Sequence, residues 1–283
     1  MAGLHPNVVI VGATGAIGSA TASRLAGRGA RLVLIARGSG RLAGLVERIQ
    51  REQRVSAVAA DLSVMSSVRL AAREIAAAVP RIDALVIAAA VFTPQPKRTG
   101  EGFEMMAATN HLGPFLITNL LRDRLVGGGR VIVIAAPSTT RFKAAELLQR
   151  DESRRPAPPP NFGALRTFGA TKAANLMFAF ELARRAKRWD VRANAFHPGL
   201  VRSQLMQEAS RPVRLLTRLV SRTPDRAGDD LAELAMSPAF DGTTGWLFKG
   251  TRRIDPPKGS LDIEAQAELW RQSVAAVGLE GGF

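Results

Sequence analysis

The sequence contains no cysteine and no tyrosine. Without cysteine the protein has no disulfides, no thiolate nucleophile and no cysteine metal ligand. Without tyrosine it has no phenol that could serve as a catalytic acid. Only three histidines occur among 283 residues, and none stands at the spacing of a metal-binding motif, so we expect no metal site.

Long apolar runs are also missing. The longest extends from Ala84 to Phe92, far short of the roughly 20 residues that a membrane-spanning helix needs. The chain enters the strand-like run Val8-Val9-Ile10-Val11 almost at once, without the basic and apolar regions of a signal peptide. We therefore expect a cytoplasmic protein.

Acidic residues are few relative to basic ones, with 24 Asp and Glu against 39 Lys and Arg and a net charge of +15. A nucleic-acid binder would cluster this charge and interleave aromatic residues, whereas here the arginines are spread along the chain. We expect no nucleic-acid partner and interpret the charge as a solvated surface. An acidic ligand or a membrane surface is the alternative.

Strand-like and helix-like segments alternate along the chain, with no internal repeat and no linker between two cores. The 46% apolar content suffices for one large core. The pattern predicts a single Rossmann-type, doubly wound α/β domain over 1–283, with a parallel sheet of about seven strands. The strands are expected over 7–11, 31–36, 55–59, 83–90, 130–135, 191–196 and 245–248.

Two long helices and a helical lid are also expected. Long helices are expected over 102–126 and 168–189, and the segment at about 200–225 is expected to form a helical lid over the substrate. Within this lid, four arginines recur at helical spacing beside apolar residues: Arg211, Arg214, Arg218 and Arg222. This stripe could attract an acidic substrate or a membrane surface, although a solvated helix face is the simpler explanation.

A glycine-rich turn follows the first expected strand. Its residues are Gly12-Ala13-Thr14-Gly15-Ala16-Ile17-Gly18, and a helix follows it. Glycines let the backbone approach a pyrophosphate, and the helix start offers free N–H groups. Because both the strand and the helix are present, we predict that Gly12, Thr14, Gly15, Ala16, Ile17 and Gly18 bind a dinucleotide. A tight turn without a ligand is the alternative.

The end of the second expected strand bears on the choice of dinucleotide. An NAD-binding protein usually places an acid there, whereas this chain has Arg37, with Arg41 nearby. This favours a 2′-phosphate and hence NADP(H), unless the two arginines are only a surface pair. After the third strand, Asp61 or Ser63 could cap the next helix. Asp61 could instead lie beside the adenine of the cofactor.

Phe168 and Lys172 stand four residues apart at the start of a predicted helix, which places them on one face. A tyrosine at position 168 would put a phenol above the ammonium, a proton donor suited to carbonyl chemistry. Asn110 lies inside the predicted helix 102–126, where asparagine is unfavourable unless its side chain has a role.

Several ordered stretches carry a resemblance to a known family. They are the glycine turn, Asp61-Leu62, Thr109-Asn110-His111-Leu112-Gly113, Phe168-x-x-x-Lys172 with Asn175, His197-Pro198-Gly199 and Ala267-Glu268-Leu269-Trp270. Over nearly its whole length the chain resembles the short-chain dehydrogenase/reductase family, and more nearly its retinol-dehydrogenase-like members.

The resemblance implies functional residues. Of the family's Asn–Ser–Tyr–Lys tetrad, Asn110 and Lys172 are present, while Phe168 stands at the tyrosine position and Ala136 at the serine position. Ser138, two residues further on, is a weak substitute for that serine. The family pattern implies that Lys172 holds ribose hydroxyls and that a substrate lies against Ala136, Ser138 and Phe168. Further cofactor contacts are implied for Leu62, Ala88, Ala89, Asn110, Pro198, Gly199 and Val201, and scaffold roles for His111 and His197.

Without the phenol, a normal tetrad mechanism is excluded. The first hypothesis is an NADP(H)-dependent oxidoreductase acting on an activated small molecule, such as an iminium ion, a quinone-like compound or a polarised alkene or carbonyl. The alternatives are a non-redox cyclase or isomerase on the same fold and a catalytically silent nucleotide-binding protein. Many relatives pair through the helices that correspond to 102–126 and 168–189, so a homo-oligomer through these helices is also expected.

Overall fold

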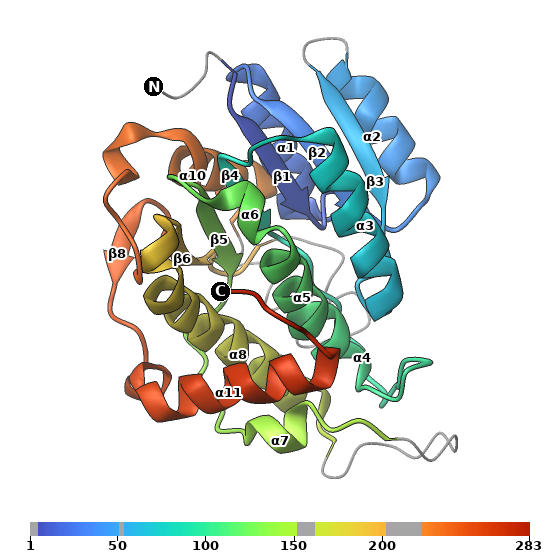
Figure 1. The fold of residues 1–283 in the computed structure, drawn as a ribbon, viewed down its shortest axis with the longest axis vertical. Helices are drawn as coiled ribbons and strands as arrows, with labels where there is room; N and C mark the ends of the chain where they lie inside the picture. The colour runs from blue at the N-terminus through green and yellow to red at the C-terminus, as the bar shows by residue number, and fades with distance from the viewer. Residues whose placement is uncertain (1–4, 51–53, 152–161, 202–221) are drawn as a thin grey trace.

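The computed structural model describes residues 5–50, 54–151, 162–201 and 222–283, and an eight-stranded sheet runs through them (Figure 1). The strand order is β3-β2-β1-β4-β5-β6-β7-β8, and every neighbouring pair is parallel except β7 and β8. The strands are β1 (Asn7–Val11), β2 (Arg31–Ala36), β3 (Val55–Ala59), β4 (Ala84–Ile87), β5 (Arg130–Ile134), β6 (Arg192–His197), β7 (Leu247–Lys249) and β8 (Arg252–Ile254).

This sheet confirms the doubly wound α/β class. The sequence indicated about seven strands, and the eighth, β8, was missed. Its three residues begin with Arg252 and Arg253, so neither length nor apolar alternation marks them as a strand. β8 closes one edge of the sheet by pairing antiparallel with β7.

Helices cover both faces of the sheet and create two apolar layers. One layer lies under α1 (Ala16–Gly27), α2 (Gly40–Gln50) and α10 (Pro224–Met236). The other lies under α3 (Met65–Ala78), α5 (Gly113–Leu120) and α8 (Ala164–Arg185). Outside α8 lie α7 (Ala144–Leu147) and the C-terminal helix α11 (Ile263–Val277) (Figure 1). No helix in the described ranges is long and apolar enough to cross a membrane.

The predicted single helix over 102–126 is wrong, because the structure divides this stretch into four pieces. They are α4 (Met105–Ala107), the π-helical turn η1 (Ala108–Leu112), α5 and α6 (Arg122–Leu125). The Glu104 carboxylate accepts the N–H of Ala107 at 2.7 Å and so fixes the start. Nearly every residue of the π turn and of α5 is buried, so apolar periodicity along this stretch could not reveal the inserted residue.

Two smaller predictions also differ from the structure. The fourth strand ends at Ile87 and not at residue 90. Neither Asp61 nor Ser63 caps α3: both carboxylate oxygens of Glu101 lie 3.1 Å from the Met65 nitrogen. Asp61 instead accepts hydrogen bonds from the backbone and hydroxyl of Ser63.

Most of the predicted lid falls on residues 202–221, including Arg211, Arg214 and Arg218, and lies outside the described residues. Its two described ends meet. Val201 forms an isolated parallel bridge with Arg222, whose backbone N–H donates to the Leu200 carbonyl at 2.7 Å. Arg222 also forms an ion pair with Asp230 at 3.0 Å. Residues 200–201 and Arg222 therefore lie together, next to the carboxyl end of β6.

Candidate active site

The glycine turn between β1 and α1 forms a compact cradle. Gly12 has φ +88°, and a Cβ there would lie 2.6 Å from the Cα of Ala89. A Cβ on Gly18 would lie 2.3 Å from the Gly12 carbonyl oxygen. The N–H groups of Gly12 and Ala13 both donate to the Ile35 carbonyl of β2. Only glycine fits these positions, and the turn is thereby fixed against β2 and the chain after β4.

The start of α1 supplies donors to this cradle. Gly15 is the N-cap and offers no capping side chain. The first hydrogen bond along the helix joins the Ser19 N–H to the Gly15 carbonyl. Three earlier N–H groups therefore lack an intrahelical partner, those of Ala16, Ile17 and Gly18. A half-buried Thr14 lies in the same turn, so the residues present fit a pyrophosphate.

The side chains predicted for the adenosine end lie at the carboxyl ends of neighbouring strands. Arg37 directly follows β2 and is exposed, and Arg41 is exposed on α2. Asp61 lies in the turn after β3. Leu62 is buried, and its carbonyl oxygen is so close to Gly113 that a Cβ there would lie 2.3 Å away. The four residues thus lie at the edge of the sheet that carries the glycine turn.

Asn110 is fully buried in the π turn η1, and its side chain forms hydrogen bonds to the loop after β4 and to α8. Its Oδ1 accepts the Val91 N–H at 2.7 Å, and its Nδ2 donates to the Val91 carbonyl at 3.0 Å. The same Nδ2 donates to Thr171 Oγ1 on α8 at 3.2 Å. Asn110 therefore holds the loop that contains Ala88 and Ala89 and ties it to the helix that carries Lys172.

The Lys172 side chain is buried beside the aromatic ring of Phe168. The residue is 7% exposed, and Nζ lies 5.3 Å from the ring centre of Phe168. Phe92 packs edge-on against Phe168 at 5.7 Å. Within the part of the chain that the structure describes, Lys172 has no hydrogen bond or ion pair. Burial lowers the pKa of Lys172 to about 8, since removal from water disfavours the charged form.

The turn after β5 brings two hydroxyls to the start of α8. Ser138 Oγ donates to Thr140 Oγ1 at 3.0 Å, and the Thr140 N–H donates back to Ser138 Oγ at 3.2 Å. A Cβ on Gly169 would lie 2.5 Å from Thr140 Oγ1 and 3.3 Å from Ser138 Oγ. The hydroxyl pair therefore lies against the residue next to Phe168. Thr140 was not predicted as a site residue. The sequence signal for it was Gly169, because a residue without a side chain directly after Phe168 leaves room for a neighbouring group.

His111, next to Asn110, connects the site to the C-terminal helix. Its Nδ1 lies 3.2 Å from Asn175 Oδ1, and its Nε2 lies 2.9 Å from Ser273 Oγ of α11. Burial lowers the pKa of His111 to about 4, so the ring is neutral at pH 7 and carries one N–H. Because Asn175 Oδ1 can only accept, Nδ1 carries the N–H and donates to it, and Nε2 is left as an acceptor. The Ser273 hydroxyl faces this Nε2 and also lies 2.7 Å from the Leu269 carbonyl, to which it donates. Asn175 Nδ2 donates in turn to the Asn110 carbonyl at 2.9 Å.

The residues after β6 complete this edge of the sheet. His197 ends the strand, and among the described residues its buried Nδ1 has no hydrogen-bond partner. Burial lowers the pKa of His197, and the positive charge of Lys249 lowers it further. Pro198 and Gly199 follow, with Gly199 at φ +74°, and then Val201 pairs with Arg222.

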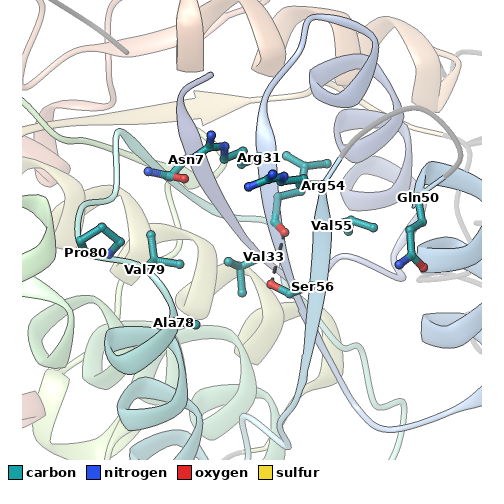
Figure 2. A pocket seen from close by; sticks show the side chains of 11 residues that line it. Asn7, Arg31, Val33, Gln50, Arg54, Val55, Ser56, Ala78, Val79 and Pro80 are labelled. Carbon is teal, nitrogen blue, oxygen red and sulfur yellow. Dashed lines mark hydrogen bonds between the residues drawn. The ribbon is translucent and has the colours of Figure 1, made fainter. Parts of the chain in front are cut away.

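The cavity drawn in Figure 2 is separate from this site. It has a volume of about 700 Å³ and lies at the amino ends of β1, β2 and β3, the edge of the sheet opposite the glycine turn. Figure 2 shows Arg31 and Arg54 at the beginnings of neighbouring strands. The described residues contain no group of three or more side chains that could hold a metal ion.

Comparisons with known proteins agree with this architecture. The model of the short chain dehydrogenase family matches residues 6–145. The chain is 34% identical to a "putative daunorubicin C-13 ketoreductase" of Streptomyces sp. (strain C5), over 96% of this chain and 92% of the relative. It is 31% identical to human retinol dehydrogenase 14, over 96% and 86%. A crystal structure of a Mycobacterium paratuberculosis protein superposes with a TM-score of 0.75 at 25% identity, over 100% of this chain and 98% of the other. The chain therefore belongs to the short-chain dehydrogenase/reductase family of NAD(P)-dependent oxidoreductases.

Proposed function

We propose that the protein is an NADP(H)-dependent reductase of an activated small molecule and that it works without a tyrosine acid. One observation carries the proposal. On α8, the ring of Phe168 stands 5.3 Å from the buried ammonium of Lys172, with no hydroxyl on the ring, while the nucleotide cradle at Gly12 is fully formed. A complete cofactor turn beside a site without its phenol favours altered chemistry over loss of nucleotide binding.

The choice of NADP(H) rests on Arg37 at the end of β2, where its guanidinium would pair with the 2′-phosphate. When bound, this cofactor supplies or accepts a hydride. The glycine turn would hold the pyrophosphate, Asp61 would lie beside the adenine, and Lys172 would donate to ribose hydroxyls. The remaining proposed cofactor contacts are Leu62, Ala88, Ala89, Asn110, Pro198, Gly199 and Val201.

The proposed substrate class follows from the absence of the tyrosine and the serine of the family tetrad. We place Phe168 at the tyrosine position and Ala136 at the serine position of the family tetrad, with Ser138 also bordering the substrate. A positioned acid is worth about 10²–10⁴-fold in rate, or roughly 3–5 kcal/mol of barrier. The substrate must therefore be electrophilic already, as iminium ions, quinone-like compounds and polarised alkenes or carbonyls are. The name of the Streptomyces relative, a ketoreductase, supports a carbonyl among these.

Binding titrations with NADPH and NADH test the cofactor part of the proposal. Quenching of tryptophan fluorescence should show saturable binding of NADPH and weaker binding of NADH. Arg37→Asp should reverse that order, because a carboxylate repels the 2′-phosphate and accepts the 2′-hydroxyl of NADH. Lys187→Asp, which makes the same two-unit change in charge at an exposed site, should leave the order unchanged. The absence of saturable binding of either nucleotide would contradict the proposal.

A non-redox cyclase or isomerase is the second candidate. The paired loss of the tyrosine and the serine, together with the apolar contact of Phe92 and Phe168, favours it over a random substitution. Substrate turnover that continues with a redox-dead analogue of NADPH would support this candidate. Binding of NADPH without turnover of any probe would favour a catalytically silent nucleotide-binding protein.

Oligomerisation through 102–126 and 168–189 and a cytoplasmic location also belong to the proposal. In the single chain, every residue from Ala170 to Ala183 on α8 is buried, and α11 packs against this helix. A pairing surface on α8 must therefore use residues outside this buried stretch. Light scattering after size-exclusion chromatography would give the number of chains in the particle.

A further inference from the structure

The geometry points to the Lys172 ammonium as the group that gives the proton to a substrate oxygen, an inference that rests on the reductase function proposed above. Family tetrads rely on a phenol for this step, and this chain has no tyrosine. Lys172 Nζ lies 5.3 Å from the centre of the Phe168 ring, on the face of α8 where such a phenol would stand. The Lys172 ammonium is therefore the acidic group placed to take over the role of the missing phenol.

The other polar groups at this face are already engaged or too weakly acidic. The Asn110 amide is committed to Val91 and Thr171. The Ser138 proton is donated to Thr140 Oγ1, which leaves the Thr140 hydroxyl as a hydrogen-bond donor. A hydroxyl can orient a carbonyl, but it is far too weak an acid to replace a phenol. In the described ranges nothing accepts a hydrogen bond from Lys172, so its three N–H groups can serve both the ribose hydroxyls and a substrate oxygen.

The environment of Lys172 makes proton release easier than from an ordinary lysine. Burial lowers its pKa from 10.5 to about 8, and no charged neighbour contributes to the shift. At pH 7 the protonated form still exceeds the neutral form by about ten to one. The other charged or titratable side chains within α8 and within the elements packed against it do not contribute to the pKa shift of Lys172; they are His111, Arg130, Glu146, Arg166, Glu181, Arg184, Arg185, Lys187, Arg188, Arg192, His197, Lys258, Glu264, Glu268 and Arg271.

The proton balance of the step is simple. The bound cofactor would supply the hydride that adds to a carbonyl carbon, and the π pair of the C=O bond would then move onto oxygen. An N–H bond of Lys172 breaks with its electron pair left on nitrogen, and an O–H bond forms. Lys172 becomes a neutral amine and is reprotonated from solvent, so the reaction consumes one solvent proton for each hydride. An iminium ion becomes a neutral amine on hydride addition and needs no proton. Comparing the reduction of a ketone with that of an iminium ion therefore distinguishes proton transfer from hydride transfer.

The variant Lys172→Arg tests whether Lys172 gives the proton. Arginine keeps a positive charge and several N–H donors, but it does not release a proton near neutral pH. The two probes are isatin, an activated ketone, and the N-methyl dihydroisoquinolinium ion, and both rates are followed as loss of NADPH absorbance. The ratio of ketone rate to iminium rate should fall by about 10²-fold or more in Lys172→Arg. It should stay constant in Lys187→Arg, the same change at an exposed position.

Each outcome of this experiment is informative. An unchanged ratio in Lys172→Arg would overturn the inference. Tryptophan-fluorescence titration reports whether the variant still binds NADPH, and failure of wild-type protein to bind NADPH would sink the proposed function instead. A ¹³Cε-lysine NMR titration, with the Lys172 signal assigned from Lys172→Arg, is expected to give a pKa near 8. A pKa near the ordinary 10.5 would overturn the inference whether or not either probe is reduced.

Discussion

Replacing Lys172 by methionine should stabilise the protein at neutral pH, because the variant no longer buries a positive charge. The pKa of Lys172 falls from 10.5 to about 8 on folding. A shift of one pKa unit corresponds to about 1.4 kcal/mol, so charging the buried amine costs about 3 kcal/mol at pH 7. Loss of the ammonium–ring contact with Phe168, worth about 0.5–2 kcal/mol, offsets part of that gain. Methionine fills nearly the same volume, and a net gain of about 1–3 kcal/mol is expected.

The pH dependence of this gain makes the prediction specific. Between pH 8 and 10.5 the unfolded chain holds a proton on Lys172 that the folded protein has released. Wild-type stability therefore rises with pH across this window, and the advantage of Lys172→Met shrinks, to about 1 kcal/mol or less at pH 9.5.

Urea unfolding followed by tryptophan fluorescence at pH 7 and 9.5 measures both quantities. Lys187→Met, at an exposed position, is the control and should show no such gain. A Lys172→Met protein that is no more stable than wild type at pH 7, or a difference that does not change with pH, would refute the reasoning. If the gain is found, the lysine lowers the stability of the fold, and a functional role explains its presence.

Two further predictions concern the site and its support. The double variant Phe168→Tyr with Ala136→Ser should gain reduction of an unactivated ketone by about 10²–10⁴-fold, measured as NADPH consumption; no gain would show that these residues do not stand at the tyrosine and serine positions. His111 has a folded pKa of about 4 against 6.5 in the unfolded chain, so its contribution to stability is complete above pH 6.5 and is lost as the pH falls toward 4. Urea unfolding at pH 7 and 5 should show a loss of about 2 kcal/mol from this group, and His111→Gln should remove that loss; an unchanged pH dependence in the variant would argue against a buried neutral ring.

The backbone of the glycine turn could be predicted from the sequence because its determinants are local. A buried strand, closely spaced glycines and a helix start follow one another within a few residues, and each dictates the backbone of the next. The same holds for Phe168 and Lys172, which one helix places on one face. The structure places both where these patterns indicate.

The rest of the site depends on contacts between residues that are distant in sequence. The π turn at Asn110 is held by hydrogen bonds to Val91 and to Thr171 on α8. The cap of α3 comes from Glu101, 36 residues beyond the helix start. His111 reaches Ser273, 162 residues away. No local pattern encodes these pairs, so a single helix over 102–126 and a cap by Asp61 were the natural but incorrect predictions.

The central claim is that this site transfers hydride from NADPH to a substrate. The most direct measurement uses NADPH deuterated at the transferable position of its nicotinamide ring, with an iminium ion or an activated ketone as substrate and mass spectrometry of the product. The expected product carries one deuterium atom, and NADP⁺ forms in equal amount. A product that forms without deuterium while NADPH is not consumed would contradict the claim and support non-redox chemistry.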